Sequence, residues 1–408
     1  MRATNHTVYF IGAGMTKSLQ TSKPVPTMFD FVSVMADYVA DPVIRVLLIE
    51  LERAKLYDCE SPTALRHANA LAQCDGHTQP DPDLLADFVR AVKDRPHESI
   101  ESLLRKADSR PGGNWADPLL RFRYGINRVF YLIGEQINWE PLERFLREQT
   151  LGNKHSHTFV SFNYDITLEC ALQRVARREW SPVFSYGFPI HWYSPTGDAG
   201  ELESHERPAG GRRPHRARPI PSDLDPGPQR IRVLKPHGSL NWLLPYRCSD
   251  ADGRWGFDEE PLVVLCKENG QLFYSSSTAP FQAVHFEGNA LPVGNALPFV
   301  MPPTGDKQTD FDFLNIVRRA ESAAIRDADR FIVVGWSMPE SDSDEVRLVQ
   351  DSLKEASGVK EVTAVNISQP ASYFERVAAV FGIQQQRLHI SNDGFPSYVY
   401  QTGGRTQN

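Results

Sequence analysis

The chain has 408 residues, of which 41% are hydrophobic and 23% are charged, an ordinary composition for a folded protein. Its net charge of −7 argues against direct nucleic-acid binding, because contact with phosphates requires clustered Lys and Arg. The sequence contains no run of about 20 apolar residues and no N-terminal signal-peptide layout. We therefore expect no membrane span and a cytoplasmic location.

The first predicted strand is TVYFI, which leads into a GAG turn. A β-branched and aromatic run that ends in small residues is typical of a buried strand followed by a phosphate-approach turn. From about residue 27 to 150 apolar residues recur three and four apart, which predicts a large helical insertion. Within it, the Asp-Pro or Ser-Pro pairs at 41–42, 61–62 and 81–82 predict helix N-caps.

A strand pattern resumes at HTFVSFNYD and is followed by the helix-spaced ITLECALQRVARR. Gly, Pro and Arg then dominate from about 194 to 229, a composition that predicts a flexible loop, because it offers too little apolar surface for a packed core. This segment holds the one strong basic cluster of the sequence, which leaves contact with a partner or a nucleic acid as a second interpretation.

In the last third of the chain, strands and helices alternate: RFIVVGWS, DSDEVRLVQDSL, VTAVNIS and ASYFERVAAVFG. This alternation is typical of parallel strands joined by crossover helices. The sequence therefore predicts a single α/β domain over 1–408 with a Rossmann-like, doubly wound and mostly parallel sheet.

The cysteines are odd in number, and none belongs to a C-x-x-C pair: Cys59, Cys74, Cys170, Cys248 and Cys266. Neither a disulfide framework nor a zinc ribbon is predicted from such spacing. We expect free thiols and no zinc.

Polar or small residues follow several predicted strands, where ligands bind in a doubly wound sheet. They are Gly12, Ala13, Gly14 and Thr16; Asn163 and Asp165; His237; Gly335 and Ser337; and Asn366. Each also has a structural interpretation when taken alone. The GAG segment could be a plain tight turn, Asp165 a helix cap, and His237 a core histidine beside a turn.

Taken in order, the segments FIGAGMT, SFNYD, KPHGSLNW, VVGWS and AVNIS resemble the sirtuin (silent-information-regulator) family. The similarity is greatest to its divergent prokaryotic branch in anti-phage defence. The resemblance implies that Gly12, Ala13, Gly14 and Thr16 approach the pyrophosphate of NAD. It further implies that Asp165 holds the nicotinamide-side ribose, that Gly335, Ser337 and Asn366 surround the adenosine half, and that Asn163 orients water or ribose beside the general base His237.

Protein-deacylating sirtuins carry a zinc ribbon after the His-Gly pair, whereas only Cys248 and Cys266 follow it here. The resemblance thus implies an NAD⁺ glycohydrolase that yields nicotinamide and ADP-ribose, a gated defence effector that depletes NAD⁺. The gate would be homo-oligomerisation or a partner, for example a nucleic-acid-sensing or ATPase defence protein. Two alternatives stay open: an NAD-dependent deacylase or ADP-ribosyltransferase, and a non-catalytic module that senses NAD or ADP-ribose.

Overall fold

A computed structural model provides the structure of the chain. It describes these residues: 5–20, 24–27, 30–53, 61–73, 80–94, 103, 118–134, 136–151, 155–176, 179–180, 185–187, 191–193, 203–204, 215–216, 230–248, 255–257, 262–264, 296–300, 312–356 and 361–403.

The centre of the protein is a six-stranded sheet in the order β13-β12-β11-β1-β2-β6, with every neighbouring pair parallel. Its strands are β1 (His6–Ile11), β2 (Ser156–Ser161), β6 (Ile231–Leu234), β11 (Arg330–Val334), β12 (Glu361–Val365) and β13 (Leu388–Ser391). The strand order reverses at β1, whose neighbours are β2 on one side and β11 on the other. The predicted doubly wound α/β sheet is confirmed.

Alternate residues of each strand enter two different cores, because successive side chains of a strand point to opposite faces. Tyr9 and Ile11 pack on one face, and Val8 and Phe10 pack on the other. The first face is covered by α1 (Ala13–Ser18), α8 (Glu140–Leu146), α9 (Thr167–Val175) and α13 (Phe395–Gly403), and the second by α11 (Ser343–Glu355) and α12 (Ala371–Val380). The helix α10 (Asp312–Asp327) contributes to both cores.

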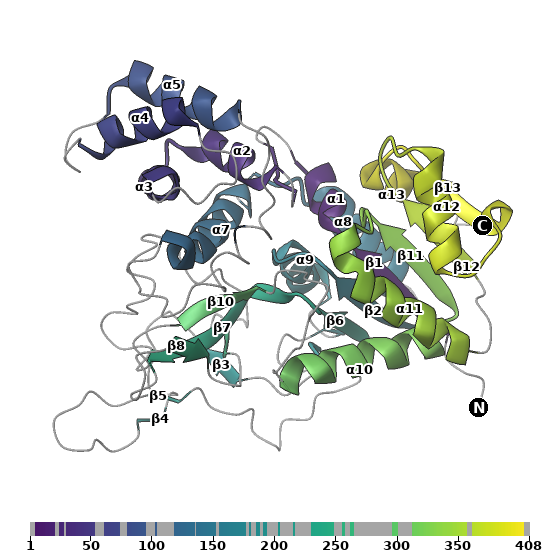
Figure 1. The fold of residues 1–408 in the computed structure, drawn as a ribbon. Coiled ribbons are helices and arrows are strands. Elements are labelled where there is room, and N and C mark those ends of the chain that lie inside the picture. Colours follow the sequence, from purple (N-terminus) through teal and green to yellow (C-terminus); the bar gives the residue numbers. More distant parts are fainter. Residues whose placement is uncertain are drawn as a thin grey trace.

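Every described secondary-structure element between α1 and β2 is helical, as predicted. They are α2 (Phe31–Met35), the 3₁₀ turn Ala36–Tyr38, α3 (Pro42–Arg53), α4 (Pro62–Ala72), α5 (Pro82–Lys93), α7 (Pro118–Gly134), α8 and the π turn Arg147–Leu151. The helices α2 to α5 and α7 form a group beside the sheet (Figure 1). The predicted caps are confirmed: Asp41, Ser61 and Asp81 each accept a backbone N–H of the following helix.

The chain also forms a second, smaller sheet, in the order β10-β7-β9-β3 with β8 paired to β7. Its strands are β3 (His191–Tyr193), β7 (Gly238–Cys248), β8 (Trp255–Phe257), β9 (Leu262–Val264) and β10 (Ala296–Val300). Of the predicted loop at 194–229, only β4 (Glu203–Ser204) and β5 (His215–Arg216) are described, as a short antiparallel pair. The rest of that loop lies outside the described residues.

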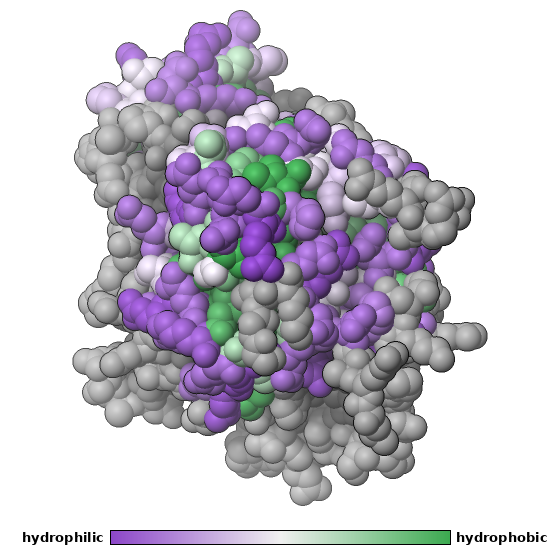
Figure 2. Space-filling view, turned by 90° about the vertical axis from the view of Figure 1, so that its right-hand side faces the viewer, coloured by the Kyte–Doolittle hydropathy of each residue, from purple (hydrophilic) through white to green (hydrophobic). Residues whose placement is uncertain are grey.

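The face beside the C-terminal elements is largely hydrophilic, with hydrophobic residues gathered in a narrow band (Figure 2). Over the part of the chain that the structure describes, no helix is both long and apolar enough to cross a membrane. Within that same part, no three His, Cys, Asp or Glu side chains are grouped as metal ligands.

Candidate functional site

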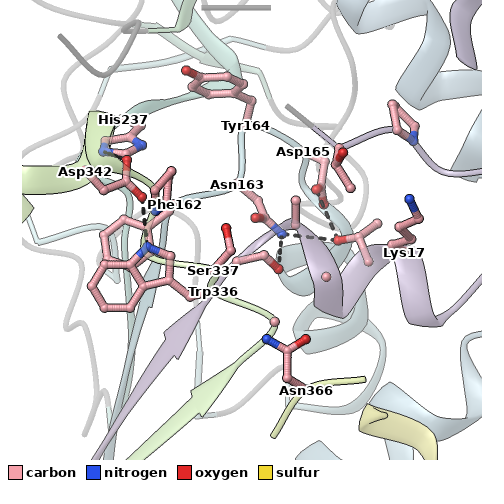
Figure 3. Close-up of a pocket in the computed structure, with 18 of the residues that line it drawn as sticks. Lys17, Phe162, Asn163, Tyr164, Asp165, His237, Trp336, Ser337, Asp342 and Asn366 are labelled. Carbon is pink, nitrogen blue, oxygen red and sulfur yellow. Dashed lines mark hydrogen bonds and ion pairs between the residues drawn. The ribbon is translucent and has the colours of Figure 1, made fainter. Parts of the chain in front are cut away.

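A cavity of about 410 Å³ lies at the carboxyl edge of the six-stranded sheet, a volume typical of small-molecule sites. Loops that follow β1, β2, β6, β11 and β12 all contribute to its lining. All ten residues predicted from the sequence line this one cavity: Gly12, Ala13, Gly14, Thr16, Asn163, Asp165, His237, Gly335, Ser337 and Asn366. Figure 3 shows Asn163 and Asp165 beside the first turn of α1, and His237 with Asp342 on another wall.

The glycines of the GAG turn are required by backbone packing. A Cβ atom on Gly12 would lie 2.4 Å from the Cα of Trp336, and one on Gly14 would lie 2.9 Å from the Cα of Gly335. Gly335 itself has a φ of +63°, and a Cβ atom there would meet the Met15 nitrogen at 2.3 Å. The turns after β1 and β11 therefore fit together only without side chains, and this contact brings both to the cavity.

Asn163 is the most clearly oriented polar side chain of the cavity. Its Nδ2 donates to the Gly12 carbonyl and to Thr16 Oγ1, both at 3.2 Å. A carbonyl can only accept, so this contact fixes which end of the amide faces the GAG turn. The side chain is 7% exposed, yet its Oδ1 has no hydrogen-bond partner within the protein. Because a buried acceptor without a partner is costly, Oδ1 is a group that a ligand or water can satisfy.

Asp165 is held from two sides. Its Oδ2 accepts from the Thr16 hydroxyl at 3.1 Å, and its Oδ1 accepts from the Thr167 amide at 2.9 Å in the first turn of α9. Asp165 therefore caps the first turn of α9, as its structural interpretation predicts. The carboxylate also lines the cavity, and each oxygen has more than one lone pair with which to accept a ligand hydroxyl.

Beneath Asp165 lies a buried ion pair that the sequence analysis missed. Lys235 Nζ is 2.8 Å from Glu169 Oε1, both side chains are fully buried, and Nζ also donates to the Asp165 carbonyl. Burial raises the pKa of Glu169 in spite of Lys235. Burial likewise raises the pKa of the Cys170 thiol to about 12, with Glu169 adding to the effect. This cysteine is thus an unreactive thiol.

The same turn that buries Lys235 presents His237 to the cavity. The Gly238 amide donates to the Lys235 carbonyl at 3.0 Å and closes the turn. Gly238 has a φ of +83°, and a Cβ atom there would lie 2.3 Å from the carbonyl oxygen of Phe299 in β10. The glycine of the His-Gly pair is therefore a backbone requirement. His237 is 2% exposed and packs on Phe162, with 5.4 Å between the ring centroids.

Two buried carboxylates approach the same nitrogen of His237. Glu345 Oε1 lies 3.4 Å from Nε2, and Asp342 Oδ1 lies 3.9 Å from it. Sequence reasoning missed both residues, because the acidic run SDSDE before a helix looks like ordinary N-terminal capping. The one feature of the sequence that points to them is their position, because they follow the Gly-x-Ser turn after a predicted buried strand.

The last wall is formed by the loops after β11 and β12. Asn366 accepts the Ile367 amide through its own Oδ1 at 2.9 Å, as expected of a turn former, and Ser337 is exposed. Met338 and Ser368 have φ values of +53° and +50°, and they are the sole non-glycine residues of the described chain in the left-handed region. Such strain clusters at functional sites.

The lining fits a ligand that combines a sugar with a base. Asn163 and Asp165 offer acceptors for hydroxyls, and Phe31, Phe130 and Tyr164 offer aromatic surface. Lys17 is the sole Lys or Arg among the described lining residues, and its Nζ lies 3.1 Å from Asp30. A pyrophosphate would therefore depend on Lys17 and on backbone N–H groups of the glycine turns.

No protein-family model matches the chain, and no curated protein matches it either.

Proposed function

We propose that the protein is a sirtuin-like NAD⁺ glycohydrolase that cleaves the bond between nicotinamide and ribose. One observation supports this proposal above the others: Asn163, whose buried Oδ1 has no partner within the protein, lines the same cavity as Asp165 and His237. The cavity is lined by five segments that lie far apart in the sequence, and these are the five segments that carry the resemblance.

The proposed reaction consumes one water: NAD⁺ and water give nicotinamide, ADP-ribose and a proton. The C–N bond breaks with its electron pair going to the cationic nicotinamide ring, which leaves as a neutral molecule and needs no general acid. Positive charge then develops at C1′ of the ribose, as in glycoside hydrolysis. Asn163 Oδ1 would hold the water or a ribose hydroxyl, Asp165 would accept from the ribose, and His237 would take the proton.

Unrestrained cleavage of NAD⁺ would harm the cell that makes the enzyme, so the proposal includes a gate. Assembly of several copies, or a partner protein of a defence system, would supply the trigger. The helical group α2 to α5 and the segment 194–229 are the candidate surfaces, on the grounds of their position and composition.

The test is incubation of the purified full-length protein with NAD⁺, with and without candidate partners, followed by mass spectrometry of the products. We expect nicotinamide and ADP-ribose, and a loss of rate of about 10²- to 10⁴-fold in His237→Ala. Asn163→Ala should lose activity as well. His389→Ala, at an exposed histidine of β13, is the matched control and should cleave at the wild-type rate.

Tight binding of NAD⁺ or ADP-ribose without turnover under every trigger would instead identify a sensing module. Transfer of an acyl or ADP-ribosyl group to or from a protein would identify the deacylase or transferase alternative. Full activity of both site variants would show that the assignment of the site is wrong.

A further inference from the structure

His237 is held by an aromatic ring that packs against its imidazole and by two carboxylates that face its Nε2. Phe162 packs on the imidazole and stacks on Trp336 with 4.3 Å between ring centroids. The Trp336 indole N–H donates to Asp342 Oδ2 at 2.8 Å, and the other oxygen of Asp342 faces His237 Nε2. Asp342 is therefore held in place from the side opposite His237.

Glu345 approaches Nε2 from α11 and is itself held by α10. Its Oε1 lies 3.4 Å from His237 Nε2 and accepts from Arg318 at 2.9 Å. The Glu345 side chain is fully buried, and Asp342 is 4% exposed. Both carboxylates are therefore shielded from solvent, and both lie on the side of the ring that carries Nε2.

An ionised carboxylate can only accept hydrogen bonds. A neutral imidazole that faces Glu345 and Asp342 through Nε2 therefore carries its proton on that nitrogen, and the lone pair lies on Nδ1. A base that is oriented by a carboxylate on its far nitrogen is the arrangement used by hydrolytic triads. In those sites the carboxylate fixes the tautomer and stabilises the imidazolium that forms when the base takes a proton.

We propose that Glu345, supported by Asp342, is a positioning residue that fixes the Nε2–H tautomer and the ring orientation of His237. This inference rests on the proposed function of His237 as the base. Glu345 is absent from the described lining of the cavity, so its effect on catalysis passes through the histidine. Arg318 would hold Glu345 in place and would not meet the substrate.

The kinetic test compares Glu345→Gln, which keeps the shape and loses the charge, with Glu345→Met, which loses the acceptor as well. We expect kcat to fall by about 10²-fold in the Met variant and by less in the Gln variant, with KM unchanged. Glu355→Met is the matched control, because Glu355 ends the same helix with a side chain that is 66% exposed. Thermal unfolding of each variant verifies that it is folded. If the Met variant does not fold, the kcat of the Gln variant decides the test.

The second readout needs no turnover. Long-range ¹H–¹⁵N spectra of the imidazole nitrogens report the tautomer of His237, whose signals are assigned by their absence in His237→Ala. We expect a protonated Nε2 in the wild type and a shift toward the other tautomer in Glu345→Met. Unchanged ring signals in that variant, or a wild-type kcat in both Glu345 variants, would overturn the positioning role. Failure of the wild type to cleave NAD⁺ would overturn the proposed function, and the spectra would still decide the role of Glu345.

Discussion

The amino and carboxyl edges of the six-stranded sheet carry similar polar residues in different circumstances. At the amino edge, His6 Nε2 lies 3.0 Å from Thr158 Oγ1, and His157 Nδ1 lies 3.1 Å from the Tyr9 hydroxyl. At the carboxyl edge, Asn163 lines a cavity and has a buried Oδ1 without a partner, and two loops adopt left-handed backbone at non-glycine residues. Each histidine at the first edge has a hydroxyl as its partner, whereas His237 at the second edge has two buried carboxylates beside one ring nitrogen.

This difference shows why residue type alone predicts little. His157 and His237 are both 2% exposed. His157 lies within β2, and His237 follows β6 of the same sheet. What distinguishes them is the strand end at which they lie, since in parallel sheets ligands bind beyond the carboxyl ends. Three predictions probe the comparison.

The first prediction concerns the buried positive charge of Lys235, which lies beneath the carboxyl edge and pairs with Glu169. Lys235→Met should lower the free energy of unfolding by about 3–5 kcal/mol, because Glu169 would remain buried without its cation. Urea unfolding measures this change. Lys354→Met is the control: Lys354 forms an exposed pair with Asp351, and its loss should cost less than about 1 kcal/mol. Equal midpoints for the two variants would show that the buried pair does not support the edge.

Lys235 and Glu169 also show what the sequence could and could not predict. The alternation of strands and helices is a local pattern, so the sheet and the residues after its strands could be predicted from it. Glu169 lies in a segment with helical spacing, and Lys235 lies at the end of a predicted strand. Neither pattern shows that the two residues meet, since 66 residues separate them. Partners of this kind follow from the three-dimensional packing of β6 against α9.

The glycines illustrate the same limit. The sequence predicts that Gly12 and Gly14 let a phosphate approach, and a plain tight turn would explain them equally well. The structure adds a third reason, which is direct contact with the turn at Gly335 and Trp336. That contact joins β1 to β11, which lie side by side in space but are more than 300 residues apart in sequence. No local pattern could have predicted it.

The second prediction concerns the acid sensitivity of the amino edge. Burial lowers the pKa of His157 to about 3, with His155 and His6 adding to the effect, from an ordinary value of 6.5. Burial also lowers the pKa of His6. The unfolded chain therefore binds more protons between pH 6.5 and 3, and stability should fall as pH falls through this window.

In His157→Asn, whose amide can still meet the Tyr9 hydroxyl, the free energy of unfolding should vary less between pH 7 and 4. Urea titrations at several pH values measure the slope, and NAD⁺ cleavage at neutral pH should be unchanged. A variant with the slope of the wild type would show that His157 is not neutral in the fold. A loss of cleavage would contradict the separation of the two edges.

The third prediction, with the smallest effect, concerns the strained loop after β12. Ser368 is exposed with a φ of +50°, a conformation that costs a non-glycine residue about 1–2 kcal/mol. Glycine removes that cost but adds about 0.5–1 kcal/mol of lost conformational entropy, so Ser368→Gly should stabilise the protein by about 0.5 kcal/mol. The reverse substitution can be made at Gly382, which has a φ of +63° and no heavy atom within 4 Å of the position that an added Cβ atom would take. Gly382→Ala should destabilise by a similar amount, and parallel urea titrations compare the two. If Ser368→Gly is instead destabilising, the left-handed backbone after β12 is held by contacts of the serine side chain and is not a source of strain at the carboxyl edge.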